Sequence, residues 1–203
     1  MAVLQRGEVR VRAEALGITR GQRVLFQNLS FEAEAGAHVA VRGANGAGKT
    51  SLLRAMAGFL PPSGGAISFD GAPDPALALH FLGHQNALKS AASVRSHVSY
   101  WAGLFGAPSN LDGVLDRLGI ARTTDLPARV LSQGQARRLA LARLLIAPRP
   151  VWLLDEPAAG LDASGRAMLD GLIGAHCAQG GIVFAAVHEP LGVAPTQTLT
   201  IAV

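Results

Sequence analysis

Apolar and polar positions alternate in part along the first third of the chain, over residues 8–16 and again over 26–33. Alternation with a period of two is typical of half-buried strands, and the Gly-containing segment 20–23 between them favours a turn. Shorter apolar runs at 38–42 and 66–69 also have the length of strands. The pattern therefore predicts a β-rich N-terminal part.

The spacing changes to that of helices between residues 88 and 146. Apolar residues within 94–105 recur at intervals of three and four, and a second apolar stripe covers 111–118. Ser132 has the side chain of a helix N-cap and precedes a third segment with an apolar face. We expect these stripes to pack into a core and not to bind a cofactor.

Strand signals return after Pro150. Residues 151–154 are continuously apolar, as expected for a strand buried on both faces of a parallel sheet. A helix is predicted over 161–177, a second buried strand over 182–187 and a last strand over 198–203. The order predicts an α/β fold with an N-terminal antiparallel β part and an inserted helical part.

Composition limits the class of protein. The chain has 203 residues, of which 49% are hydrophobic and 16% charged, and we found no run of about 18 apolar residues. The N-terminus also lacks the apolar block of a signal peptide. We therefore expect one cytosolic domain that does not itself span a bilayer. Cys177 is the only cysteine, which excludes an internal disulfide.

The charge balance leaves two interpretations open. The formal net charge is +4, and the only lysines are Lys49 and Lys89, so arginine dominates the basic residues. A basic surface can bind nucleic acid or anionic lipid. The alternative is a set of scattered, solvated arginines, which we favour because no dense basic run is present.

A glycine-rich loop between a strand and a helix carries the first chemical signal. It fits the pattern of a phosphate-binding loop, with Gly43, Ala44, Asn45, Gly46, Ala47, Gly48, Lys49 and Thr50. Glycines let backbone N–H groups turn toward phosphate oxygens, and the N-terminus of the following helix adds positive potential. We expect Lys49 to pair with the β- and γ-phosphates and Thr50 to bind Mg²⁺.

An acidic pair, Asp155 and Glu156, follows the apolar strand 151–154. Ligands of open α/β sheets bind at the carboxyl ends of the strands, which is where these side chains would lie. Asp155 is then a second group for Mg²⁺, and Glu156 is the candidate general base that activates water.

The segment Leu131, Ser132, Gln133, Gly134 and Gln135 lies between these two motifs. Together, the motifs resemble those of the ATP-binding subunits of ABC transporters over essentially the whole chain. The resemblance implies a P-loop NTPase core of the ABC ATPase type, in which this segment is the signature motif. In that family, the signature motif contacts the γ-phosphate of a nucleotide held by a second subunit. Gln133 stands where the family usually has glycine.

The same resemblance assigns four more residues. Gln85 matches the glutamine that senses Mg²⁺ and the membrane partner, and Asp162 matches the acid of the loop that crosses the dimer interface. His188 matches the switch histidine that contacts the γ-phosphate. Arg20 falls where many members have an aromatic residue that stacks on adenine, and a guanidinium can stack in its place.

Several short segments are similar to a narrower family, the ATP-binding subunits of the bacterial haem exporter complex for c-type cytochrome biogenesis. They are residues 23–31, 83–85, 139–144 and 179–188. This resemblance implies an ATPase with ATP and Mg²⁺ as cofactors, paired with a second copy and coupled to integral membrane subunits. It also implies a peripheral position on the cytoplasmic face of the inner membrane and no nucleic acid partner.

The domain organisation follows from the same resemblance. One ATP-binding domain covers 1–203, with a core in 1–87 and 147–203 and a helical subdomain in 88–146.

Three other functions remain open at this point. They are an ABC ATPase for another substrate, a phosphoryl-transferring P-loop kinase, and a soluble ATPase associated with nucleic acid.

Overall fold

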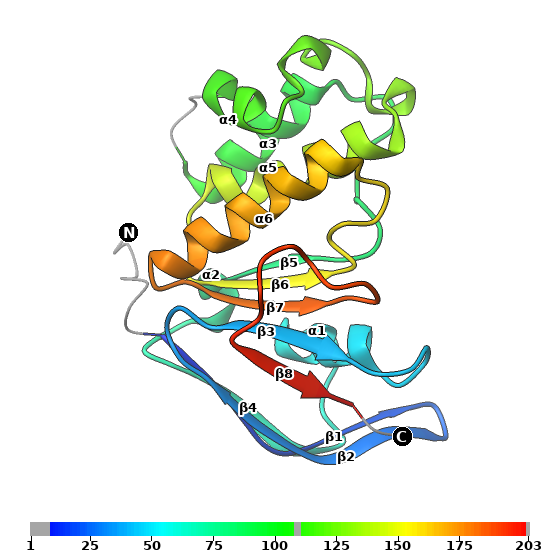
Figure 1. Cartoon of the computed structure of the whole chain (residues 1–203), viewed down its shortest axis with the longest axis vertical. Coiled ribbons are helices and arrows are strands. Elements are labelled where there is room, and N and C mark those ends of the chain that lie inside the picture. The colour runs from blue at the N-terminus through cyan, green and yellow to red at the C-terminus, as the bar shows by residue number, and fades with distance from the viewer. Residues whose placement is uncertain (1–8, 108–110, 202–203) are drawn as a thin grey trace.

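The computed structural model describes residues 9–107 and 111–201. An antiparallel sheet forms from the N-terminal part, and Figure 1 shows it at the end of the molecule opposite the helical part. Its strand order is β2–β1–β4, with β1 at Arg10–Arg20, β2 at Arg23–Ala33 and β4 at Gly64–Asp70.

A five-stranded parallel sheet lies in the middle of the molecule (Figure 1). Its order is β5–β6–β7–β3–β8, with β3 at His38–Arg42, β5 at Leu79–Leu82, β6 at Val151–Asp155, β7 at Ile182–Ala186 and β8 at Gln197–Thr200. The strand that enters the glycine-rich loop, β3, and the strand that ends in Asp155, β6, both pair with β7. The carboxyl ends of these strands therefore bring the two motifs to one edge of the sheet.

Helices cover both faces of the parallel sheet. Their bounds are α1 at Lys49–Met56, α2 at Pro75–Ala78, α3 at Val94–Phe105, α4 at Leu111–Arg117, α5 at Gln133–Ile146 and α6 at Ala163–Ala178, with 3₁₀ turns at Ala121–Thr123 and Ala128–Val130. Within 9–107 and 111–201, none of the helices has the length and apolarity needed to cross a membrane.

Two hydrophobic cores lie on opposite sides of the parallel sheet. Val151 and Leu153 of β6 face α1 and the antiparallel sheet, whereas Trp152 and Leu154 face α5, α6 and the helical part. Every residue of β6 is buried, which confirms the prediction of a strand covered on both faces.

The ends of the N-terminal strands differ from the prediction. Strands β1 and β2 extend to Arg20 and Arg23, and the pairing shifts register between Ala13 and Leu16. Ala15 there has a left-handed φ of 46° and is exposed together with Glu14. This irregularity interrupts the alternation of β1, and the strand continues beyond it.

The predictions after Pro150 are confirmed with shifted ends. Helix α6 begins later than predicted because the side chain of Asp162 caps it, accepting a hydrogen bond from the N–H of Gly165 at 2.8 Å. The last strand ends at Thr200, and residues 202–203 of its predicted range lie outside the described residues.

The sequence analysis did not predict α2 and β5. Helix α2 ends at Ala78 and strand β5 begins at Leu79, with no turn residue between them. The spacing of apolar residues therefore does not show where one element ends and the next begins.

Candidate nucleotide-binding site

Left-handed backbone conformations shape the loop between β3 and α1. Gly43, Gly46 and Gly48 have φ values of 153°, 78° and 111°. A Cβ atom at Gly43 would lie 2.7 Å from the carbonyl oxygen of Ile201, and one at Gly48 would lie 3.1 Å from the ring of Phe26. Glycine is therefore required at both positions. No side chain caps α1, so the N–H groups at its start remain available to an anion.

Lys49 lies back over this loop. Its Nζ atom donates to the carbonyl oxygens of Gly43 at 2.8 Å and Ala44 at 3.3 Å, and the residue is 8% exposed. The loop thus holds a nearly buried ammonium group above its own N–H groups, the charge arrangement that a polyphosphate needs.

Thr50 connects the loop to the end of β6. Its Oγ1 atom donates to both carboxylate oxygens of Asp155, at 3.1 and 3.0 Å, and Asp155 is 2% exposed. One hydroxyl oxygen and a carboxylate converge at this point. Oxygen donors of this kind suit Mg²⁺, so the residues present fit the ion that the sequence analysis predicted here.

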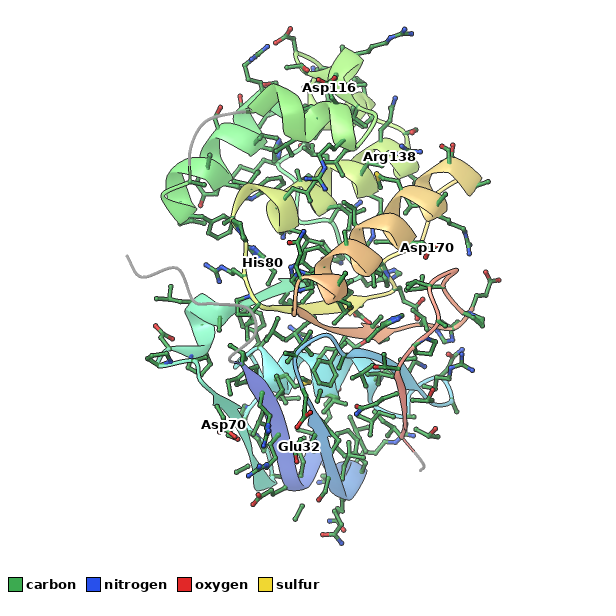
Figure 2. The ribbon with its side chains drawn as sticks, turned by 60° about the vertical axis from the view of Figure 1, so that its left-hand side comes forward. Glu32, Asp70, His80, Asp116, Arg138 and Asp170 are labelled. Carbon is green, nitrogen blue, oxygen red and sulfur yellow. The ribbon has the colours of Figure 1, made fainter. Side chains whose placement is uncertain are left out.

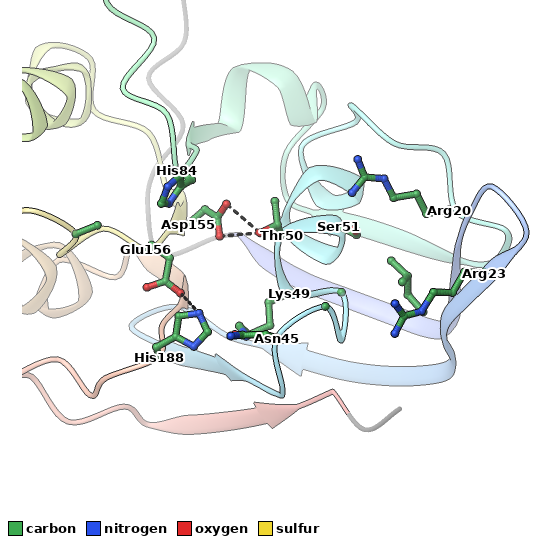
Figure 3. A pocket seen from close by; sticks show the side chains of 14 residues that line it. Arg20, Arg23, Asn45, Lys49, Thr50, Ser51, His84, Asp155, Glu156 and His188 are labelled. Atoms are coloured by element: carbon green, nitrogen blue, oxygen red, sulfur yellow. Dashed lines mark hydrogen bonds and ion pairs between the residues drawn. The ribbon is translucent and has the colours of Figure 1, made fainter.

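Glu156 and His188 lie side by side next to Asp155 (Figure 3). The Nε2 atom of His188 is 3.4 Å from Oε1 of Glu156. Glu156 has a left-handed φ of 49°, uncommon for a residue with a side chain, and its N–H donates to the carbonyl oxygen of Ala186. The irregular backbone turns the carboxylate of Glu156 away from the path of β6 and toward His188.

These groups line one cavity of about 620 Å³, a size typical of small-molecule sites. Figure 3 shows Lys49, Asp155, Glu156 and His188 on one side of it and Arg20 on the other. The residues that line it are Arg20, Arg23, Leu25, Asn45, Gly46, Gly48, Lys49, Thr50, Ser51, His84, Asp155, Glu156, Ala159 and His188. The lining thus joins the predicted phosphate, metal and base positions in one space.

Gln85 is not among the lining residues. Its side chain is exposed, and the cavity is lined instead by the neighbouring His84. The sequence analysis gave His84, Arg23 and Ser51 no role in the site. Ser51 follows the predicted Thr50 in the sequence, and Arg23 pairs with the predicted Arg20 across the hairpin. That proximity was the signal that could have found them.

The segment 131–135 lies outside this cavity. Ser132 caps α5, accepting from the N–H of Gln135, while the Gln135 side chain accepts from the N–H of Ser132. A Cβ atom at Gly134 would lie 3.1 Å from the carbonyl oxygen of Gly160, and one at Gly160 would lie 3.3 Å from the Cβ of Gln133. The segment therefore packs against the loop that leads to Asp162.

Comparisons with known proteins agree with this geometry. The profile of the ABC transporter family matches residues 26–159. A cytochrome c biogenesis ATP-binding export protein CcmA from Rhodopseudomonas palustris (strain HaA2) is 46% identical, with 91% of this chain and 94% of the relative covered. A CcmA from Bradyrhizobium diazoefficiens is 51% identical, with 86% and 89% covered. The chain belongs to the ABC transporter family, among the CcmA proteins.

Solved structures support the same assignment of fold. A putative ABC transporter ATP-binding protein from Pyrococcus furiosus superposes with a TM-score of 0.81 at 23% identity, over 95% of this chain and 97% of that one. CbiO1 from Clostridium perfringens, part of an ABC transporter complex, gives 0.74 at 29% identity, over 90% and 79%. The predicted P-loop NTPase fold of the ABC ATPase type is confirmed.

Membership of this family decides between an ABC-type ATPase and a kinase, two of the functions that the sequence left open. The chain is an ATP-binding, ATP-hydrolysing subunit of the ABC type, a family whose ATPases work as dimers with membrane subunits. The alternative of a phosphoryl-transferring kinase is therefore rejected. The boundaries of the helical subdomain at 88 and 146 stay a prediction, as do the roles of individual site residues.

Proposed function

We propose that this chain is the ATPase of a haem exporter complex that acts in c-type cytochrome biogenesis. Its relatives at 41–51% identity are named cytochrome c biogenesis ATP-binding export proteins, and they match most of the chain. The observation that supports a dimeric ATPase is the division of the site: Lys49, Asp155, Glu156 and His188 meet at one cavity, whereas Ser132 lies outside it. In the proposal, each chain supplies the two halves of a composite site to two different nucleotides.

In the proposed reaction, the loop N–H groups and Lys49 bind the phosphates of ATP. Thr50 and Asp155 would hold Mg²⁺, and the ion, when bound, would neutralise charge on the phosphates. Glu156 accepts a proton from water as its oxygen attacks the γ-phosphorus, and the bond to the bridging oxygen breaks to leave ADP. His188, next to Glu156, contacts the γ-phosphate.

The second half of the site comes from another copy. Ser132, the exposed N-cap of α5, offers a hydroxyl group and a helix dipole to the γ-phosphate held by the partner. Two ATP molecules then lie between two chains, and hydrolysis opens the dimer again. We place this dimer on the cytoplasmic face of the bacterial inner membrane, bound to integral subunits of the haem exporter type that it drives.

The ATP-dependent dimer is tested with Glu156→Gln, which keeps the shape of the side chain but removes the base. Size-exclusion chromatography with Mg-ATP is expected to show a stable dimer that wild type does not accumulate. The matched control adds Ser132→Arg to Glu156→Gln, which leaves the first half of the site as it is in the single variant and obstructs the second. A Glu156→Gln chain that stays monomeric with bound ATP contradicts the composite site.

The cellular role is tested by deleting the gene and staining membranes for covalently bound haem. Loss of c-type cytochromes is expected, with recovery on expression of wild type and none with Lys49→Ala. Normal cytochrome levels in the deletion strain would rule out the proposed role in cytochrome biogenesis while leaving ATP hydrolysis untouched.

A further inference from the structure

Arg137 is the largest fully buried side chain among the described residues, at 2% exposed. It lies one turn into α5, behind the segment 131–135. A buried guanidinium is costly unless each of its five N–H groups finds an acceptor. Here all five donate, over 2.7–3.1 Å, to the carbonyl oxygens of Gly83, Asp155, Glu156 and Pro157 and to the side-chain oxygen of Asn86.

Three of those carbonyl oxygens are consecutive and flank the candidate base. Nη2 binds Asp155 and Glu156, and Nε binds Pro157. Glu156 is the residue with the left-handed φ of 49°, a strained conformation for a residue with a side chain that persists only where surrounding contacts impose it. Arg137 supplies such contacts on both sides of the irregular peptide.

The remaining two bonds reach the segment 83–86. Nη1 binds the carbonyl oxygen of Gly83 and the side chain of Asn86, on either side of His84, which lines the cavity. One side chain thus joins the helix behind Ser132 to two parts of the cavity wall. Burial lowers the pKa of Arg137 to about 10, so the guanidinium stays charged at neutral pH.

We propose that Arg137 is a positioning residue that holds Glu156 in its reactive conformation and ties it to the helix of the signature segment. This inference rests on the proposed role of Glu156 as general base. Movement of α5, when Ser132 binds the nucleotide of a second copy, is transmitted through Arg137 to the base in the same chain.

The chain offers a matched control in Arg143. It lies on the same helix, is also largely buried, donates to the carbonyl oxygen of Asn86 at 3.0 Å and packs over Trp101. Among the described residues, it makes no hydrogen bond to 155–157. Loss of Arg143 therefore removes a buried arginine of α5 and leaves the support of Glu156 in place.

The test compares Arg137→Gln, Arg137→Lys and Arg143→Gln in the full chain. We expect Arg137→Gln to lower kcat of ATP hydrolysis about tenfold or more with KM for ATP nearly unchanged, since general base catalysis contributes about 10²–10⁴-fold. Arg137→Lys, which keeps the charge and three donors, recovers part of kcat. Arg143→Gln keeps kcat within about twofold while losing a similar amount of thermal stability.

A double variant separates positioning from general loss of structure. If Arg137 acts through Glu156, adding Arg137→Gln to Glu156→Gln lowers the residual rate no further. Multiplicative losses, an unchanged kcat in Arg137→Gln, or equal losses in Arg143→Gln would each overturn the proposal. If Arg137→Gln does not fold, Arg137→Lys carries the same comparisons.

Amide hydrogen exchange tests the support of Glu156 without relying on hydrolysis. We expect faster exchange at residues 156–159 in Arg137→Gln than in Arg143→Gln, and unchanged exchange there overturns the inference. A wild-type chain without ATPase activity would count against the proposed function, whereas the exchange result still decides the role of Arg137.

Discussion

Thr50 Oγ1 lies 3.1 Å from Oδ1 and 3.0 Å from Oδ2 of Asp155, so a single hydroxyl hydrogen is shared between both carboxylate oxygens. The two residues are 105 positions apart in the sequence and meet because α1 packs on β6 beneath the loop. This contact joins the phosphate loop to the acidic pair and defines where Mg²⁺ would be held.

Thr50→Val removes the hydroxyl group and keeps the volume of the side chain. We expect the Mg²⁺ concentration at half-maximal ATPase activity to rise about tenfold, corresponding to about 1.4 kcal/mol of lost binding. Thr50→Ser restores the hydroxyl and should stay close to wild type. A Mg²⁺ titration of the ATPase rate checks both, and equal curves for Thr50→Val and wild type contradict the metal site.

His188→Gln tests the contact with Glu156. The substitution removes the imidazole and leaves a neutral polar group, so we expect kcat to fall about 100-fold with little change in KM for ATP. Steady-state kinetics give both constants. Glu189→Gln is the control, because Glu189 is the next residue, pairs with Arg166 at 3.1 Å and does not line the cavity. Comparable losses in the two variants would count against a role for His188.

Much of the fold was predictable because local signals agreed with the long-range arrangement. The buried strand β3 was predicted with its observed bounds, and the N-cap of α5 at Ser132 was predicted from a single residue type. The phosphate loop and the acidic pair each follow a strand, so the parallel sheet brings them together.

The unpredicted features depend on contacts between distant residues. Nothing in the sequence around Arg137 distinguishes it from the exposed arginines, because four of its five acceptors are backbone carbonyls, at positions 83 and 155–157. The choice of His84 over Gln85 as the cavity residue depends on the turn after β5, a strand that the spacing did not predict.

Gln133→Gly tests the effect of having glutamine in the signature segment, where the family usually has glycine. The side chain of Gln133 lies against Gly160, and a smaller residue gives a second copy closer access to the start of α5. In the Glu156→Gln background, we expect the ATP concentration needed for dimerisation to fall several-fold, with Gln133→Ala intermediate. Light scattering during an ATP titration measures the effect. Weaker dimerisation in Gln133→Gly would show that Gln133 itself contacts the partner.

Arg20 and Arg23 form a cross-strand pair at the end of the β1–β2 hairpin, and both line the cavity. If Arg20 stacks on the base, Arg20→Ala should weaken ATP binding about fivefold, and Arg20→Tyr should restore it. Equilibrium titration with a fluorescent ATP analogue checks this, with the exposed Arg122→Ala in the helical part as control. An Arg20→Ala chain with wild-type affinity would place the base elsewhere.

The stability of the chain is predicted to fall in mild acid because of His80. Figure 2 shows this residue in the interior, where α5 runs over the sheet, and its Nε2 is 2.7 Å from the carbonyl oxygen of Ala147. Burial lowers the pKa of His80 to about 3, with smaller contributions from the charges of Arg149, Arg143 and His176.

The sign follows from proton binding. Between pH 6.5 and 3 the unfolded chain binds a proton at His80 that the folded chain does not, so the contribution of His80 to the free energy of unfolding decreases as pH falls through this range and is constant above it. At pH 5 the loss amounts to about 2 kcal/mol. Denaturant unfolding of wild type and His80→Gln at pH 7 and pH 5 isolates the effect, because His80→Gln should lose less stability on acidification. The exposed His84→Gln should behave as wild type, and equal pH dependence in all three chains would assign the acid sensitivity to other groups.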